Sequence, residues 1–69
     1  MPPLYVVEQG ARLSIEQRRI RVHAPGGDLL AQVPLAHTTA VIVFGNVSIT
    51  TPAMKRLMQT GIDVVFLTS

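Results

Sequence analysis

The sequence predicts a mainly β domain of the α+β class, in which an antiparallel β-meander is followed by a strand, a short helix and a second strand. Two early stretches alternate polar and apolar residues, which is typical of strands with one solvated face. Two later stretches are apolar without alternation, and a short segment with helical spacing lies between them. Because the chain has 69 residues, residues 1–69 are interpreted as a single β-rich domain.

The chain begins with a short strand and a turn. Residues 4–7, Leu-Tyr-Val-Val, follow two prolines and belong to residue types that favour strands. Gln9-Gly10 then marks a turn before the first alternating stretch.

The two alternating stretches, residues 12–16 and 19–23, predict a β-hairpin that turns at Gln17-Arg18. This dipeptide lacks the Asn-Gly chemistry that two-residue turns favour. An opposite-charge pair then lies across the strands beside the turn and contributes about 0.2–1 kcal/mol. The predicted register pairs Glu16 with Arg19, Ile15 with Ile20, Ser14 with Arg21, Leu13 with Val22, and Arg12 with His23.

A third strand completes the predicted meander. Pro25-Gly26-Gly27-Asp28 has the chemistry of a turn, since proline presets one dihedral angle and glycine permits a positive φ. Alternate residues from 29 to 35 share an apolar face. Pro34 has no N–H to donate to a neighbouring strand, so it should lie at a sheet edge or at the end of the strand.

The second half of the chain predicts strand, helix, strand. Residues 40–44 and 63–67 are apolar runs, and both are expected to be covered on both faces. Thr51 is interpreted as the helix N-cap with Pro52 at the first helical position, and Gly61 as the C-terminal cap. The two strands pair either directly in parallel or with residues 47–50 between them, and the crossover is expected to be right-handed.

The predicted helix, residues 52–60, is amphipathic. Lys55, Arg56 and Gln59 lie on its polar side. The two methionines of the opposite side are expected to fill the core. That apolar side consists of Ala53, Met54, Leu57 and Met58.

The composition predicts an interface with another chain or domain. A domain of this size buries only about 60 % of its unfolded surface, yet 48 % of the residues are hydrophobic. The last strand carries Phe66 and Leu67 and is followed only by Thr68-Ser69, so the chain is expected to be part of a longer protein.

Four of the six cationic residues, Arg12, Arg18, Arg19 and Arg21, lie on or beside the predicted hairpin. Two interpretations remain open: the arginines solvate the outer face of the hairpin, or they bind phosphate groups. The net charge is +2.

The sequence contains no motif for catalysis or metal binding, and no catalytic or metal-ligating residue is assigned. There is no cysteine, the four carboxylates share no motif, and His23 and His37 have no acidic partner nearby in the sequence. No apolar run approaches the ~18 residues that a membrane span needs, and no signal peptide is visible. A cytoplasmic protein without a membrane contact is therefore expected.

An ordered set of segments resembles one known family. Residues 41–50 read Val-Ile-Val-Phe-Gly-Asn-Val-Ser-Ile-Thr, a Thr-Pro helix start follows, and residues 61–67 read Gly-Ile-Asp-Val-Val-Phe-Leu. Residues 4–6, 10–14 and 30–35 fit the same pattern in the same order. Together they resemble the N-terminal β-rich domain of the CRISPR-associated spacer-acquisition integrase. The residues that carry this signature, in a structural role, are Phe44, Gly45, Asn46, Pro52 and Gly61.

The resemblance implies a metal-dependent DNA endonuclease and integrase that inserts new spacers into CRISPR arrays in antiviral defence. It implies that Mg or Mn is bound in a separate helical domain, with no cofactor in this chain, so neither histidine inherits a metal-binding role. It implies a homodimer through this domain, double-stranded DNA as the substrate of the full-length protein, and a small CRISPR-associated partner bound by the helical domain. Arg12, Arg19 and Arg21 then become candidates for DNA-phosphate contacts. The alternative is a stand-alone oligomerising module with no nucleic-acid role.

Overall fold

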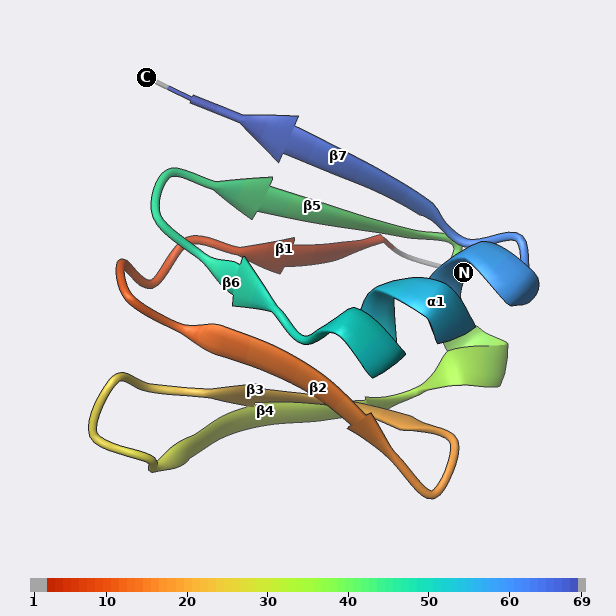
Figure 1. Cartoon of the computed structure of the whole chain (residues 1–69), viewed down its shortest axis with the longest axis horizontal. Helices are drawn as coiled ribbons and strands as arrows, with labels where there is room; N and C mark the ends of the chain where they lie inside the picture. The colour runs from red at the N-terminus through yellow and green to blue at the C-terminus, as the bar shows by residue number, and fades with distance from the viewer. Residues whose placement is uncertain (1–2, 69) are drawn as a thin grey trace.

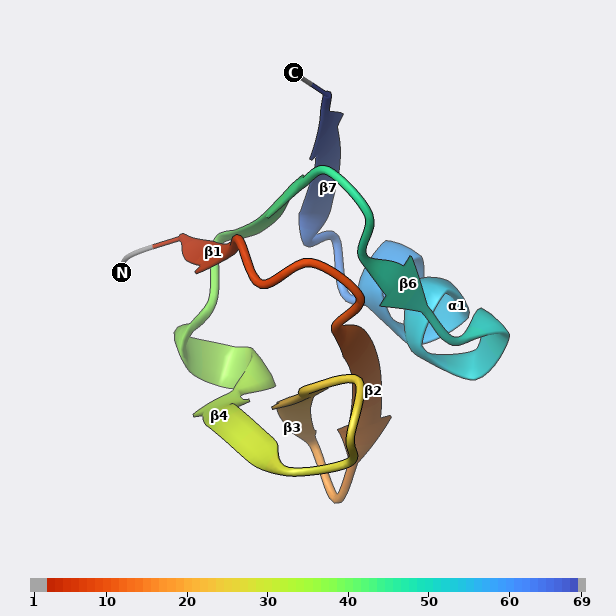
Figure 2. The same ribbon diagram turned by 90° about the vertical axis from the view of Figure 1, so that its left-hand side faces the viewer.

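The computed structural model describes residues 3–68, which form two β-sheets, one α-helix and one 3-10 turn (Figure 1). A three-stranded sheet has the order β1-β5-β7, and a four-stranded sheet has the order β4-β3-β2-β6. Figure 2 shows the two sheets as separate layers, with the helix beside them at one side of the molecule. The elements are β1 (Leu4–Val6), β2 (Arg12–Glu16), β3 (Arg19–His23), β4 (Leu29–Pro34), η1 (Leu35–His37), β5 (Ala40–Phe44), β6 (Ser48–Ile49), α1 (Thr51–Gln59) and β7 (Asp63–Leu67).

The three-stranded sheet is entirely parallel. β1 pairs with β5, and β5 pairs with β7, so the strands on either side of the helix are direct neighbours. This settles the strand order that the sequence left open. The intervening segment pairs elsewhere, because β6 runs parallel to β2 in the other sheet.

The antiparallel meander β2-β3-β4 has the predicted hairpin register, in which Glu16 lies opposite Arg19 and Leu13 opposite Val22. Gln17 and Arg18 both adopt positive φ angles, of 52° and 63°. A type I′ turn requires this conformation at both central residues. The turn therefore forms without asparagine or glycine, and the pairing of the flanking strands stabilises it. Pro34 is the last residue of the edge strand β4, as predicted.

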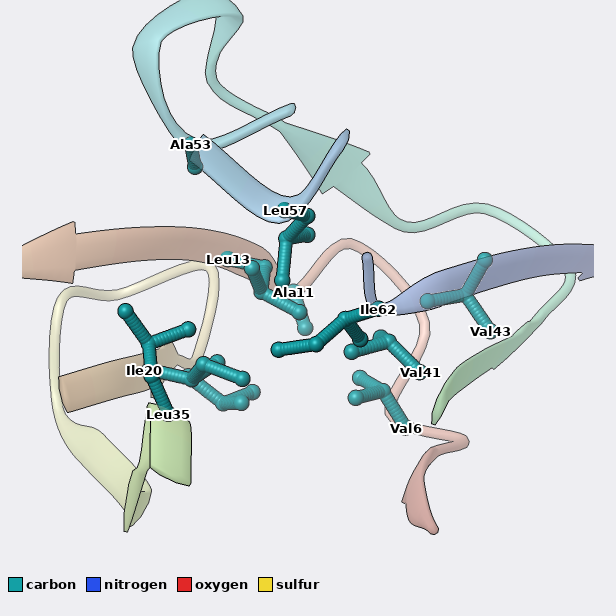
Figure 3. Close-up of a cluster of buried hydrophobic side chains, with 11 residues drawn as sticks. Val6, Ala11, Leu13, Ile20, Leu35, Val41, Val43, Ala53, Leu57 and Ile62 are labelled. Carbon is teal, nitrogen blue, oxygen red and sulfur yellow. The ribbon is translucent and has the colours of Figure 1, made fainter. Parts of the chain in front are cut away.

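A single apolar core lies between the two sheets and α1 (Figure 3). α1 packs on β2 and β7. It contributes Ala53 and Leu57, which are 1 % and 0 % exposed. The expectation that both methionines fill the core is wrong for Met58, which is 72 % exposed, while Met54 is half-buried. The reason is that a single narrow stripe of this short helix contacts the sheets.

The helix termini are capped as the sequence predicts, with a shift of one residue at the start. Thr50, not Thr51, is the N-cap, because its Oγ1 accepts a hydrogen bond from Ala53 N at 3.2 Å. At the C-terminus Gly61 has φ 76°, and Ile62 N donates to Leu57 O at 3.0 Å. This is a Schellman motif, in which a left-handed glycine satisfies the last carbonyls of the helix.

The expectation that both apolar strands are covered on both faces is wrong for β7. This strand lies at the edge of its sheet, and Val65, Phe66 and Leu67 are each more than 40 % exposed. β5 is central, and its inward residues Val41 and Val43 are buried. The expectation also fails for the outward face of β5, where Ile42 and Phe44 are only half-buried, because no described element covers the outward side of this sheet. β7 is the more exposed strand because it has a neighbouring strand on one side only.

Candidate functional site

The parallel sheet presents an apolar surface on the side that faces away from the core. Strand register places Tyr5, Ile42 and Val65 in one row across this side and Phe44 and Leu67 in the next. Side chains of registered neighbours in a parallel sheet point to the same face. We call these five side chains the outer face.

The outer face has the chemistry of a contact surface. Tyr5 is 59 % exposed, and its ring centroid lies 6.3 Å from that of Phe44. Val65 and Leu67 are 41 % and 43 % exposed. The three strands carry a single charged residue, Asp63, at one end of β7. Contiguous exposed apolar side chains of this kind mark interaction sites.

The turn after β5 contains two of the family-signature residues, Gly45 and Asn46, and a third, Phe44, ends the strand. The side chain of Gln9 holds this turn in place. Gln9 Nε2 donates to Phe44 O at 3.1 Å, and Gln9 Oε1 accepts from Asn46 N at 2.9 Å. Gly45 has φ 73°, and a Cβ atom there would lie 2.6 Å from the Gln9 amide. The signature therefore specifies a backbone shape. No local pattern indicates that Gln9 contributes, because Gln9 lies 37 residues from Asn46.

The three arginines expected to contact phosphate do not form one site. Arg21 Nη1 makes an ion pair with Glu16 Oε2 at 2.6 Å, so the ion pair is diagonal and is not the predicted Glu16–Arg19 pair. Arg12 and Arg19 are exposed, but they lie at opposite ends of the hairpin. Four residue steps along a strand separate these ends, which is about 14 Å. The phosphate role of the three residues stays a prediction.

A different set of arginines does come together. Arg18 and Arg19 from the β2–β3 turn and Arg56 from α1 line a hollow of about 720 Å³. Arg18 and Arg56 also line an adjoining hollow of about 320 Å³ beside Pro52. None of the residues that line either hollow is acidic. We call the larger one the arginine hollow. Sequence reasoning placed Arg56 on the polar side of the helix, but only the packing of α1 on β2 brings it close to the turn.

The described residues do not combine into a metal site. Between residues 3 and 68, no three histidine, aspartate or glutamate side chains gather closely enough to hold a metal ion. His23 Nδ1 is buried and without a hydrogen-bond partner, and His37 lies in η1. The described residues therefore do not fit Mg or Mn. In the same range, no helix is long and apolar enough to cross a membrane.

The class of protein follows from comparison with known families. The family model described as CRISPR associated protein Cas1 matches residues 4–69. A CRISPR-associated endonuclease Cas1 of Thermus thermophilus is 33 % identical over 63 residues, which are 91 % of this chain and 20 % of the relative. A Cas4 exonuclease/Cas1 endonuclease fusion of Geobacter sulfurreducens is 35 % identical over 66 residues, 96 % of this chain and 10 % of the relative. The chain belongs to the Cas1 family, and it spans about a fifth or less of the length of these relatives.

Solved structures show the same fold. The chain matches a partial Cas6-RT-Cas1–Cas2 complex with a TM-score of 0.89 at 19 % identity, covering 97 % of this chain and 20 % of that one. It matches a Cas1 protein from Thermotoga maritima with a TM-score of 0.80 at 21 % identity, covering 97 % and 21 %. It matches a Cas1–DNA complex with a TM-score of 0.80 at 24 % identity, and the match covers 99 % of this chain and 23 % of that one. The resemblance to the N-terminal β-rich domain of the family is confirmed, and so is the mainly β fold class.

Proposed function

We propose that this domain dimerises a Cas1-type endonuclease and positions DNA for the insertion of new spacers into CRISPR arrays. Membership of the Cas1 family supports the CRISPR role. The outer face is the observation that carries the dimerisation part of the proposal. The catalytic metal, Mg or Mn, belongs under this proposal to another domain of the full-length protein, and the protein acts in the cytoplasm.

The proposed partner at the outer face is a second copy of the same domain. An isologous two-fold contact uses the same surface on both subunits, so it must be complementary to itself. An apolar surface satisfies this condition without requiring opposite charges, and Tyr5 and Phe44 supply the aromatic side chains that are enriched in interface centres. Homodimerisation through the outer face would also cover the exposed side of β7.

Double-stranded DNA is the proposed substrate of the full-length protein, and a small CRISPR-associated protein is its proposed further partner. One structural neighbour is a Cas1–DNA complex, and another is a complex that contains Cas1 and Cas2. Exposed arginines on the hairpin and helix give this domain the charge to contact a phosphate backbone, which positions a duplex without reading its sequence.

The dimer proposal is tested by placing a charge on the outer face of the full-length protein. Val65→Glu is expected to convert a dimer into a monomer in sedimentation-velocity experiments, because the carboxylate would lose its hydration in the interface. Leu29→Glu is the matched control, since Leu29 is 48 % exposed but lies on β4 of the other sheet. A Val65→Glu protein that remains dimeric would show that the interface lies elsewhere.

The alternative, an oligomerising module without a nucleic-acid role, shares the outer face with the first proposal. It differs in one outcome, because such a module would not bind duplex DNA even at low salt. Binding of labelled duplex to the full-length protein at low ionic strength therefore separates the two proposals.

A further inference from the structure

We propose that the arginine hollow binds a phosphate group of the DNA backbone and is a discrete contact between this domain and one DNA strand. The inference rests on the proposed function for its ligand, since that function names DNA as the polyanion. It assigns the contact to Arg18, Arg19 and Arg56, and it excludes Arg21 from it.

The charge distribution points to an anion. Three arginines line one concavity of about 720 Å³, and none of the residues that line it is acidic. Across residues 3–68, the ion pair that the structure shows is Arg21–Glu16, which belongs to the outward side of the hairpin. The three arginines of the hollow take no part in that ion pair, so the hollow gathers positive charge. A phosphate carries the opposite charge and offers several acceptors to planar guanidinium groups.

The backbone holds the arginines in place before any ligand arrives. Arg18 lies in a left-handed turn with φ 63°, and its carbonyl accepts a hydrogen bond from Leu35 N at 2.9 Å. Arg56 precedes Leu57, which is fully buried, and its carbonyl accepts from Thr60 Oγ1 at 2.9 Å. Arginines fixed at the backbone lose less conformational entropy on binding than arginines in a mobile loop.

The other walls of the hollow make it a positioning contact. Leu35 and Ile62 are each 8 % exposed, and apolar walls of this kind strengthen the attraction between a guanidinium and an anion. The hydroxyls of Thr38 and Thr60 donate to the carbonyls of Pro34 and Arg56. These hydroxyl protons already form hydrogen bonds within the protein, so the arginine side chains remain as the principal donors to a bound anion. A site built in this way binds a backbone phosphate and does not distinguish bases.

The test measures how salt weakens the binding of duplex DNA by the full-length protein. Each phosphate contact contributes about 0.9 to the slope of log K against log salt concentration. Arg18→Gln and Arg56→Gln are each expected to reduce the slope by about 0.9, and at 0.1 M salt this corresponds to an affinity loss of about eightfold. Ala36→Glu, which adds a carboxylate at an exposed position of the hollow, is expected to weaken binding in the same direction.

Lys55→Gln is the matched control. Lys55 is an exposed cation directly before Arg56 on α1, but it does not line the hollow. The Lys55→Gln variant should leave the salt slope unchanged. The thermal unfolding midpoints of all variants should match that of the parent protein. The site would be overturned if Arg18→Gln and Arg56→Gln had the same salt slope as the parent. It would also be overturned if Lys55→Gln reduced the slope as much as these two variants do. Either result would leave the proposed function intact. A parent protein that binds no duplex DNA would overturn both.

Discussion

The contact between Gln9 and the turn at Gly45 predicts a strong coupling between two residues far apart in the sequence. Gly45→Ala forces a side chain into a left-handed conformation, which costs about 1–2 kcal/mol. It also places Cβ 2.6 Å from both the nitrogen and the oxygen of the Gln9 amide. Gln9 must then move, and its hydrogen bonds to Phe44 O and Asn46 N are lost.

The magnitudes follow from these contacts. Two hydrogen bonds at an exposed site contribute about 1–2 kcal/mol together, so Gln9→Ala should cost about that amount. Gly45→Ala should cost about 2–4 kcal/mol, the sum of the backbone term and the same hydrogen bonds. Because the bonds can be lost only once, the double variant should cost about as much as Gly45→Ala alone.

Urea unfolding of the four proteins of this cycle measures the coupling. We expect the two single costs to exceed the cost of the double variant by about 1–2 kcal/mol. Strict additivity would refute the reasoning, because it would mean that Gln9 keeps its contacts when Gly45 is replaced.

Three further predictions concern stability. Thr50→Ala should lower the free energy of unfolding by about 1 kcal/mol because the N-cap hydrogen bond is lost, whereas Thr51→Ala should change it far less. Urea titration measures both costs, and a larger cost for Thr51→Ala than for Thr50→Ala would contradict the assigned cap. Leu57→Ala should cost about 2–5 kcal/mol because the side chain is fully buried, and a loss below 1 kcal/mol in the same assay would contradict that packing. Glu16→Gln should cost under about 1 kcal/mol, because the side chains of its ion pair with Arg21 are 61 % and 33 % exposed, and 1 M salt should reduce the difference.

Local patterns predicted most of the fold. The hairpin register followed from the alternation of Leu13 and Ile15 with polar neighbours, since a slip of one residue would expose the whole apolar set. The helix cap was displaced by one residue because two consecutive threonines precede Pro52 and either has the chemistry to cap.

Long-range placement was harder to predict. The apolar run of β7 has the same pattern as a strand buried on both faces, and only the strand order shows that it lies at a sheet edge. Arg56 was recognised as polar helix surface, but its position beside Arg18 depends on how α1 packs against β2. The sequence therefore identified arginines of the hairpin as candidates, whereas the structure groups Arg18 and Arg19 with a helix residue.

The most direct test of the proposed dimer measures distances between spin labels in the full-length protein. One label per subunit is attached at Val65 on the outer face, and in a separate sample at Leu29 on the opposite sheet. Dimerisation through the outer face predicts that the distance between the two Val65 labels is much the shorter of the two. A shorter distance between the Leu29 labels, or no dipolar coupling at Val65 in a sample that sediments as a dimer, would contradict it.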